Sequence, residues 1–127
     1  MVVDANVLAA YFLEPGKRRE QTKHLFRRTN QLHAPALWRT EFLNVIRKYV
    51  AVRGLSRDAA VSAHAEADYE LTTLAQADAG LILDLSRASD CSIYDCEYVA
   101  AAMVRESFLF TFDQKLIRAF PAIAREP

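Results

Sequence analysis

Two acidic residues lie at junctions between a predicted strand and the predicted helix that follows it. Carboxylates at such junctions can take part in ligand binding or catalysis. Asp4 follows the apolar pair Val2 and Val3, and Asp113 follows the run 107–112. In an open α/β sheet the carboxyl ends of the strands meet the starts of helices, so ligands collect there. For Asp4 the alternative role is a helix N-cap, for which Asp is among the preferred residues. The residues around Asp4 leave both roles open.

Two further acidic residues lie within predicted helices. Glu41 lies on the apolar stripe of a helix expected at 37–52, where a buried charge must be paired, protonated or bound to a cation. Its alternative is a place at the edge of the stripe, or an ion pair with a neighbouring arginine. Asp95 is the third residue after the predicted cap Ser92, so a capping box is its structural alternative.

Acids at strand ends and helix acids can meet at one point above a sheet. Like charges in close contact raise at least one pKa, and a divalent cation removes that conflict. Mg²⁺ and Mn²⁺ prefer oxygen ligands, and a pair of such ions is a known device for phosphoryl transfer. Zinc is the poorer match, because no cluster of His or Cys accompanies the acids. We therefore expect Mg²⁺ or Mn²⁺ as the cofactor.

The elements that would position these acids alternate along the chain. Strands are expected at 2–3, 31–36, 69–74 and 107–112. Helices are expected at 7–12, 17–30, 37–52, 56–68, 78–88, 92–105 and 114–120. This alternation predicts an α/β fold, a three-layer α/β/α sandwich with a central, mainly parallel sheet of about four to five strands. Within it, the run 107–112 is expected to be a fully buried strand, and Val50 to face the core.

Composition is that of one globular domain. The chain has 127 residues, of which 52% are hydrophobic and 25% charged, so we expect a single domain over 1–127. The apolar start is too short to span a bilayer and lacks the basic region of a signal peptide, which favours a cytoplasmic protein without a membrane segment. Cys91 and Cys96 have no further ligands nearby and are expected to be reduced packing residues.

Charge is sorted along the chain although its formal sum is zero. Residues 1–57 carry eleven Lys and Arg against four Asp and Glu, and residues 58–127 carry five against twelve. Such sorting favours a polyanion, or an oppositely charged partner, that meets the basic half. A solvated helix face is the alternative for any single basic cluster.

Four short motifs, taken together, resemble the acidic motifs of PIN-domain ribonucleases. They are Asp4-Ala-Asn6, Glu41, Tyr94-Asp95 with Tyr98, and Thr111-Phe-Asp113. The chain length, and the position of the first motif next to Met1, are most similar to VapC-type toxins of type II toxin–antitoxin pairs. The resemblance implies that Asp4, Glu41, Asp95 and Asp113 bind the metal and are catalytic, with Asn6 and Thr111 as polar residues beside it. No family motif matches residues 54–77.

The resemblance further implies a Mg²⁺- or Mn²⁺-dependent endoribonuclease, a homodimer and a cognate antitoxin that blocks the acids. RNA would then be the polyanion that meets the basic half. The side chains expected to contact RNA are Lys17, Arg18, Arg19, Arg27, Arg28, Arg39 and Arg47. Phe12 and Trp38 could belong to a partner surface, but burial in the core is expected for both. The alternative function is a non-catalytic RNA- or protein-binding module of PIN-like fold.

Overall fold

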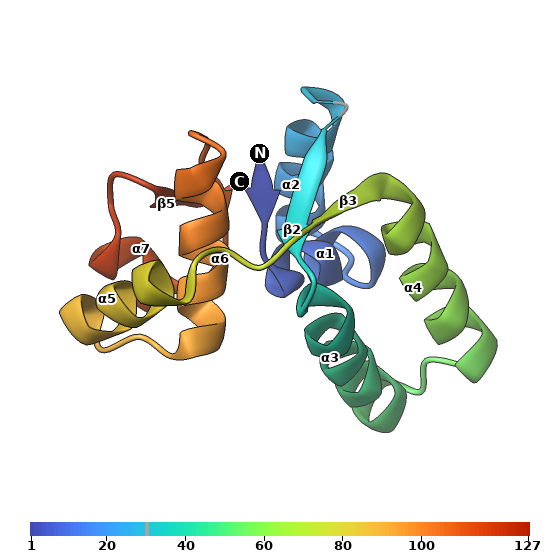
Figure 1. The fold of residues 1–127 in the computed structure, drawn as a ribbon. Helices are drawn as coiled ribbons and strands as arrows, with labels where there is room; N and C mark the ends of the chain where they lie inside the picture. Colours follow the sequence, from blue (N-terminus) through green and yellow to red (C-terminus); the bar gives the residue numbers. More distant parts are fainter. Residues whose placement is uncertain (30) are drawn as a thin grey trace.

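A five-stranded parallel sheet forms the centre of the computed structural model, which describes residues 1–29 and 31–127 (Figure 1). The strand order is β3-β2-β1-β4-β5, and every neighbouring pair is parallel. The strands are β1 Val2–Val3, β2 Leu32–Pro35, β3 Leu71–Leu74, β4 Leu109–Phe110 and β5 Ala124–Arg125. β1 therefore lies in the middle of the sheet.

Seven helices make the connections between these strands. They are α1 Ala5–Phe12, α2 Lys17–Arg27, α3 Trp38–Arg53, α4 Arg57–Glu70, α5 Ala79–Ser89, α6 Ile93–Val104 and α7 Gln114–Ala119. The chain steps from β1 to β3 in one direction and then returns past β1 to β4. Because such crossovers are right-handed, this reversal places the helices before β3 on one face of the sheet and the helices after β3 on the other. Figure 1 shows α5, α6 and α7 on one side of the sheet and α1, α3 and α4 on the other, so the predicted three-layer sandwich is confirmed.

The core lies between the sheet and its helices. Val2 and Val3 are fully buried, and the small side chains of α6 let that helix pack closely on β1, β2 and β4. Trp38 is fully buried at the start of α3, as expected, and Phe12 is partly buried against the core. Trp38 is therefore not available to a partner surface.

The distal half of α3 departs from the sequence prediction. Val50 was expected to face the core, but its side chain is 40% exposed. The buried positions of α3 end at Ile46, because the last two turns of the helix extend beyond the sheet. Gly54 ends the helix in the left-handed conformation (φ 66°), which a glycine adopts without steric cost.

The third and fourth strands begin later than predicted. The strand expected from Tyr69 begins at Leu71, because α4 continues until the Leu71 N–H donates to the carbonyl of Ala67. The run 107–112 contributes only Leu109–Phe110 to the sheet, since its first residues complete the turn after α6. Phe108 is 41% exposed, so the prediction of a fully buried strand was wrong.

The ends of other elements add further detail. β5 was not predicted as a strand, and it is held to β4 by the Leu109 N–H, which donates to the Ile123 carbonyl at 3.0 Å. The helix expected at 17–30 ends at Arg27, and its last expected residue, Asn30, lies outside the described residues. Cys91 and Cys96 are free and buried. Across 1–29 and 31–127, none of the helices has the length and apolar character needed to cross a bilayer.

Candidate active site

The centre of the candidate site is the carboxyl edge of β1 and β4. Their register pairs Val3 with Phe110, so the next residues, Asp4 and Thr111, leave the sheet side by side. The Asp4 N–H donates to the Phe110 carbonyl at 3.0 Å. The helices that follow these strands, α1 and α7, lie on opposite faces of the sheet (Figure 1), so β1 and β4 mark the point at which the order of the strands reverses. Such a switch point is the usual ligand site of an open α/β sheet.

A polar network fixes the carboxylate of Asp4. Its Oδ2 accepts hydrogen bonds from Asn6 Nδ2 at 2.6 Å and from the Thr111 hydroxyl at 2.7 Å. Asn6 Oδ1 in turn accepts from the Phe112 N–H at 2.9 Å. Asp4 precedes α1, but its side chain makes no capping hydrogen bond to the first turn of that helix as described. The hydrogen-bond network, and not a role as helix cap, therefore explains how the Asp4 side chain is positioned.

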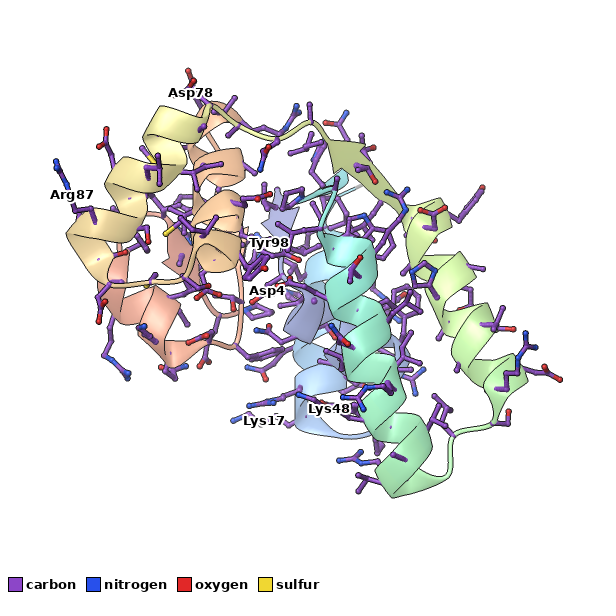
Figure 2. The ribbon with its side chains drawn as sticks, turned by 60° about the horizontal axis from the view of Figure 1, so that its bottom comes forward. Asp4, Lys17, Lys48, Asp78, Arg87 and Tyr98 are labelled. Carbon is purple, nitrogen blue, oxygen red and sulfur yellow. The ribbon has the colours of Figure 1, made fainter. Side chains whose placement is uncertain are left out.

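Glu41 is held by a tyrosine from the opposite layer. Its Oε2 accepts a hydrogen bond from the Tyr98 hydroxyl at 2.7 Å, which links α3 to α6. Figure 2 shows Tyr98 and Asp4 between these two helices. Arg39, a predicted alternative partner, pairs instead with Asp68 of α4. In the sequence Tyr98 is marked only as part of the Tyr94-Asp95 motif, although its place one turn after Asp95 indicates that both side chains face the same way.

Asp95 and Asp113 both cap helices. Asp95 forms the capping box with Ser92, whose N–H donates to Asp95 Oδ2 at 3.3 Å. Asp113 Oδ1 accepts from the N–H groups of Lys115 at 2.7 Å and Leu116 at 3.3 Å. The capping box, expected as the structural alternative for Asp95, is therefore present in the structure. In each residue these bonds go to a single carboxylate oxygen.

All four acids line one open cleft of about 310 Å³. Asn6 and Asn44 complete its polar wall, and Asn44 lies one turn after Glu41 on α3, a spacing that could have pointed to it. Two cavities of about 480 Å³ lie elsewhere on the protein, so its chemistry and not its size distinguishes this cleft. Every wall group that could ligate a cation offers oxygen, the donor that Mg²⁺ and Mn²⁺ prefer. Among the described residues, however, no three acidic, His or Cys side chains are close enough to hold an ion as they stand.

Burial and repulsion between like charges make the carboxyl groups of Asp4 and Glu41 harder to ionise. Burial raises the pKa of Asp4 above its ordinary value, and the nearby charge of Asp95 adds to this rise. Burial also raises the pKa of Glu41, with further contributions from the charges of Asp4 and Asp95. The pKa of Tyr98 is raised by its burial and by the charges of Asp4 and Glu41, so this hydroxyl remains a hydrogen-bond donor at neutral pH. A bound cation would relieve the repulsion between these carboxylates.

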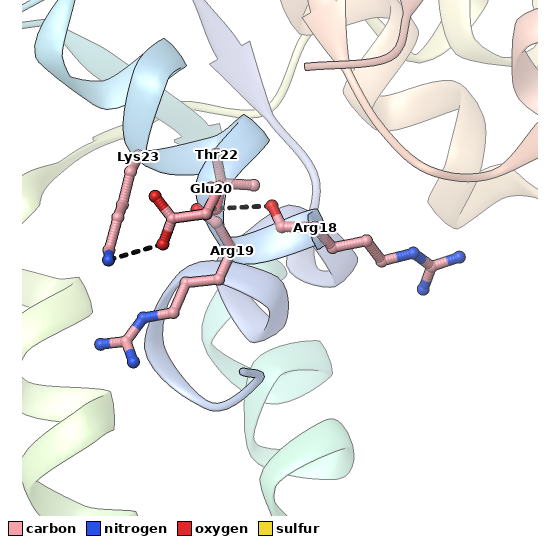
Figure 3. A network of polar contacts seen from close by, with 5 residues as sticks. All are labelled: Arg18, Arg19, Glu20, Thr22 and Lys23. Carbon is pink, nitrogen blue, oxygen red and sulfur yellow. Dashed lines mark hydrogen bonds and ion pairs between the residues drawn. The ribbon is translucent and has the colours of Figure 1, made fainter. Parts of the chain in front are cut away.

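The basic side chains of α2 point in different directions. Figure 3 shows Arg18 directed away from Arg19 and Lys23. The Arg18 guanidinium lies 4.8 Å from the centre of the ring of Phe112, the residue that precedes Asp113 in the sequence. Arg19 and Lys23 line a different cavity, against α1 and α4.

The remaining basic residues named by sequence reasoning are scattered. Arg28 lines a cavity with Met1, at the edge of the sheet opposite the acids. Arg39 is engaged with Asp68, and Arg27 and Arg47 are exposed on α2 and α3. Figure 2 shows Lys17 on α2 and Lys48 on α3, both on the same side of Asp4 in this view. In the described part of the chain, none of the basic residues predicted to contact RNA is among the residues that line the acid cleft.

Comparison with known proteins gives consistent matches along the chain. A family model described as the PIN domain matches residues 1–121. Ribonuclease VapC3 from Pyrobaculum aerophilum is 31% identical over 128 residues, which cover 97% of this chain and 96% of that protein.

Two solved structures show the same fold. The crystal structure of PAE2754 from Pyrobaculum aerophilum has a TM-score of 0.78 and 18% identity, covering 97% of this chain and 81% of that one. A toxin–antitoxin complex from Klebsiella pneumoniae contains a chain with a TM-score of 0.72 and 15% identity, covering 98% of this chain and 95% of that one.

Proposed function

Because this chain belongs to the PIN domain family, we propose that it is an endoribonuclease that hydrolyses RNA phosphodiester bonds with the aid of Mg²⁺ or Mn²⁺. The observation that carries this proposal is the convergence of four carboxylates on one cleft. Two of them precede α1 and α7, and two lie on α3 and α6, elements that are far apart in sequence. The ribonuclease name of the VapC3 relative supports the choice of RNA as substrate.

The residues that would hold the metal are Asp4, Glu41, Asp95 and Asp113. When bound, Mg²⁺ or Mn²⁺ acidifies water and stabilises the charge on phosphate oxygens. Asn6 and Thr111 orient Asp4, and Tyr98 orients Glu41, so two of the four carboxylates are held by hydrogen bonds from neighbouring side chains. Because the capping bonds of Asp95 and Asp113 use one oxygen each, the other oxygen of each is left for a cation. The side chains must still move closer together to ligate an ion.

Basic residues beside the cleft would bind the RNA backbone. Arg18 lies over the ring of Phe112, the residue before Asp113, and Lys17 and Lys48 lie on one side of Asp4 in the view of Figure 2. These side chains are the first candidates for contacts with the RNA backbone, because a bound phosphate must lie close to a basic side chain and to the acids at the same time. The expected products of hydrolysis are a 5′-phosphate and a 3′-hydroxyl.

The test is RNA cleavage by the purified protein with and without divalent metal. We expect new 5′-phosphate ends on single-stranded RNA with Mn²⁺ or Mg²⁺, and none with a chelator. End mapping by ligation to a 5′-phosphate-dependent adaptor distinguishes this product from the 2′,3′-cyclic phosphate of metal-independent ribonucleases. RNA binding without new ends under any metal would favour the alternative, a non-catalytic binding module.

We further propose that the protein is the cytoplasmic toxin of a type II pair, a homodimer that a cognate antitoxin inhibits. The VapC name of the relative and the toxin–antitoxin complex among the similar structures support this assignment. Light scattering after size-exclusion chromatography should give twice the subunit mass of 14.3 kDa. A single subunit mass at all concentrations would contradict the homodimer.

A further inference from the structure

A second cavity adjoins the acid cleft. It has a volume of about 370 Å³ and lies between α3 and the first turn of α6. Its lining residues are Leu37, Thr40, Glu41, Asn44 and Tyr94. Glu41 and Asn44 also line the acid cleft, so the two spaces are neighbours with a shared wall.

One wall of this cavity is an exposed aromatic ring. Tyr94 is 65% exposed and directly precedes Asp95 in the sequence. Leu37 supplies an apolar surface that is partly buried against the core. Thr40 and Asn44 lie one turn apart on α3 and add a hydroxyl and an amide.

These groups fit a nucleobase better than a phosphate. A flat ring, an apolar side and a few polar groups at the edge are the features with which proteins hold unstacked RNA bases. A phosphate would need positive charge, but the lining residues described for this cavity include one carboxylate and no Lys or Arg. The cationic side chains near the cleft, Arg18 and Lys17, belong to α2 and do not line this cavity.

We propose that this cavity binds the base of a nucleotide next to the cleaved phosphate. The proposal rests on the proposed function, since it takes RNA to be the substrate of the adjoining cleft. Tyr94 stacks on the base, and Asn44 and Thr40 form hydrogen bonds with its edge. Tyr94 therefore contributes affinity for any base, whereas Asn44 and Thr40 decide which base is preferred.

The experiment separates base binding from phosphate binding. Asp4→Asn is the background, so that RNA stays intact during the measurement. Fluorescence anisotropy gives the Kd of labelled oligo(U), oligo(A), oligo(C) and oligo(G), and of an abasic ribose-phosphate strand of the same length. The ratio of the abasic Kd to the tightest homopolymer Kd measures the contribution of the bases.

Tyr94→Ala should lower this ratio by about 5- to 100-fold, the range that corresponds to the loss of one stacked base, and leave the abasic Kd unchanged. Tyr94→Phe keeps the ring and should retain the ratio. Tyr69→Ala is the matched control, because Tyr69 is 90% exposed on α4 and lies outside the cavity. Asn44→Ala should change which homopolymer binds most tightly.

A ratio that Tyr94→Ala leaves unchanged would overturn the base-binding proposal, and so would an equal loss of affinity for the abasic strand. Cleavage by the wild-type protein is measured separately. If the wild type cleaves RNA while the ratio does not depend on Tyr94, the subsite fails and the nuclease stands. If the ratio falls as expected but the wild type does not cleave, the subsite stands and the nuclease fails.

Discussion

Replacing Asp4 or Asp95 by asparagine should lower the rate of RNA cleavage by at least about 100-fold, because each change removes one charged metal ligand worth several kcal/mol of transition-state stabilisation. Asparagine has nearly the same shape as aspartate, so the loss would come from charge and not from packing. The measurement is the single-turnover rate on an RNA that the wild type cleaves.

The same variants should remain folded. In Asp4→Asn an amide oxygen can still accept a hydrogen bond from Asn6 or Thr111, while an ionisable group in a buried place is lost. We therefore expect the metal-free unfolding temperature of Asp4→Asn to equal or exceed that of the wild type. Asp84→Asn, an exposed position on α5, is the matched control and should cleave like the wild type. Wild-type rates in both site variants would show that the acids are structural and would favour a binding module.

Mn²⁺ should stabilise the folded wild-type protein, and by more at about pH 8 than at about pH 5, where carboxylates begin to bind protons. A ligand that binds only the folded state stabilises it by about 2.7 kcal/mol when its concentration is 100 times Kd. Because protons and the cation compete for the same oxygens, the metal gains affinity as the acids ionise. Thermal unfolding with increasing Mn²⁺ or Mg²⁺ measures this directly.

The metal-free protein should show the opposite trend at these groups. Burial raises the pKa of Asp4 and Glu41 in the folded state, so the folded protein binds these protons more tightly than the unfolded chain. Their contribution to the unfolding free energy is complete below the ordinary carboxyl pKa of about 4 and is lost as pH rises through the raised values. Other carboxylates titrate as well, so the difference between the wild type and Asp4→Asn isolates Asp4.

Both parts of this prediction can fail separately. The metal-free difference in unfolding free energy, wild type minus Asp4→Asn, should fall as pH rises from the carboxyl range toward neutrality. A difference that rises instead would mean that Asp4 prefers to be ionised without metal. An equal response of the wild type and Asp4→Asn to Mn²⁺ would mean that Asp4 is not a ligand.

Features set by short-range interactions could be predicted from the sequence. Ser56, Asp78 and Ser92 stand first in three predicted helices and cap them, since each side chain accepts from an N–H three residues later. The order of strands and helices, and with it the parallel sheet, also followed from hydrophobic pattern and turn residues. The place of each acid along these elements was therefore known, although its function stays a prediction.

Features set by contacts between distant segments could not be predicted. Whether Asp4 caps α1 depends on Thr111, which lies 107 residues away and offers a stronger partner at 2.7 Å. β5 is too short to have a pattern of its own, and it is a strand only because β4 lies beside it. Val50 is exposed because α3 extends beyond the sheet, and nothing in the local spacing marks where the sheet stops.

The basic residues show the same difference between what the sequence determines and what the tertiary structure determines. The sequence determined that the first half of the chain is basic, but neighbours on one helix, Arg18 and Arg19, point in different directions (Figure 3). The cavity beside Tyr94 likewise exists only because α3 and α6 stand next to one another. The sequence by itself determined which elements form and which chemical groups they carry, because capping and periodicity act over a few residues. Only the tertiary structure decided which groups share a cleft, because that depends on how distant helices pack on one sheet.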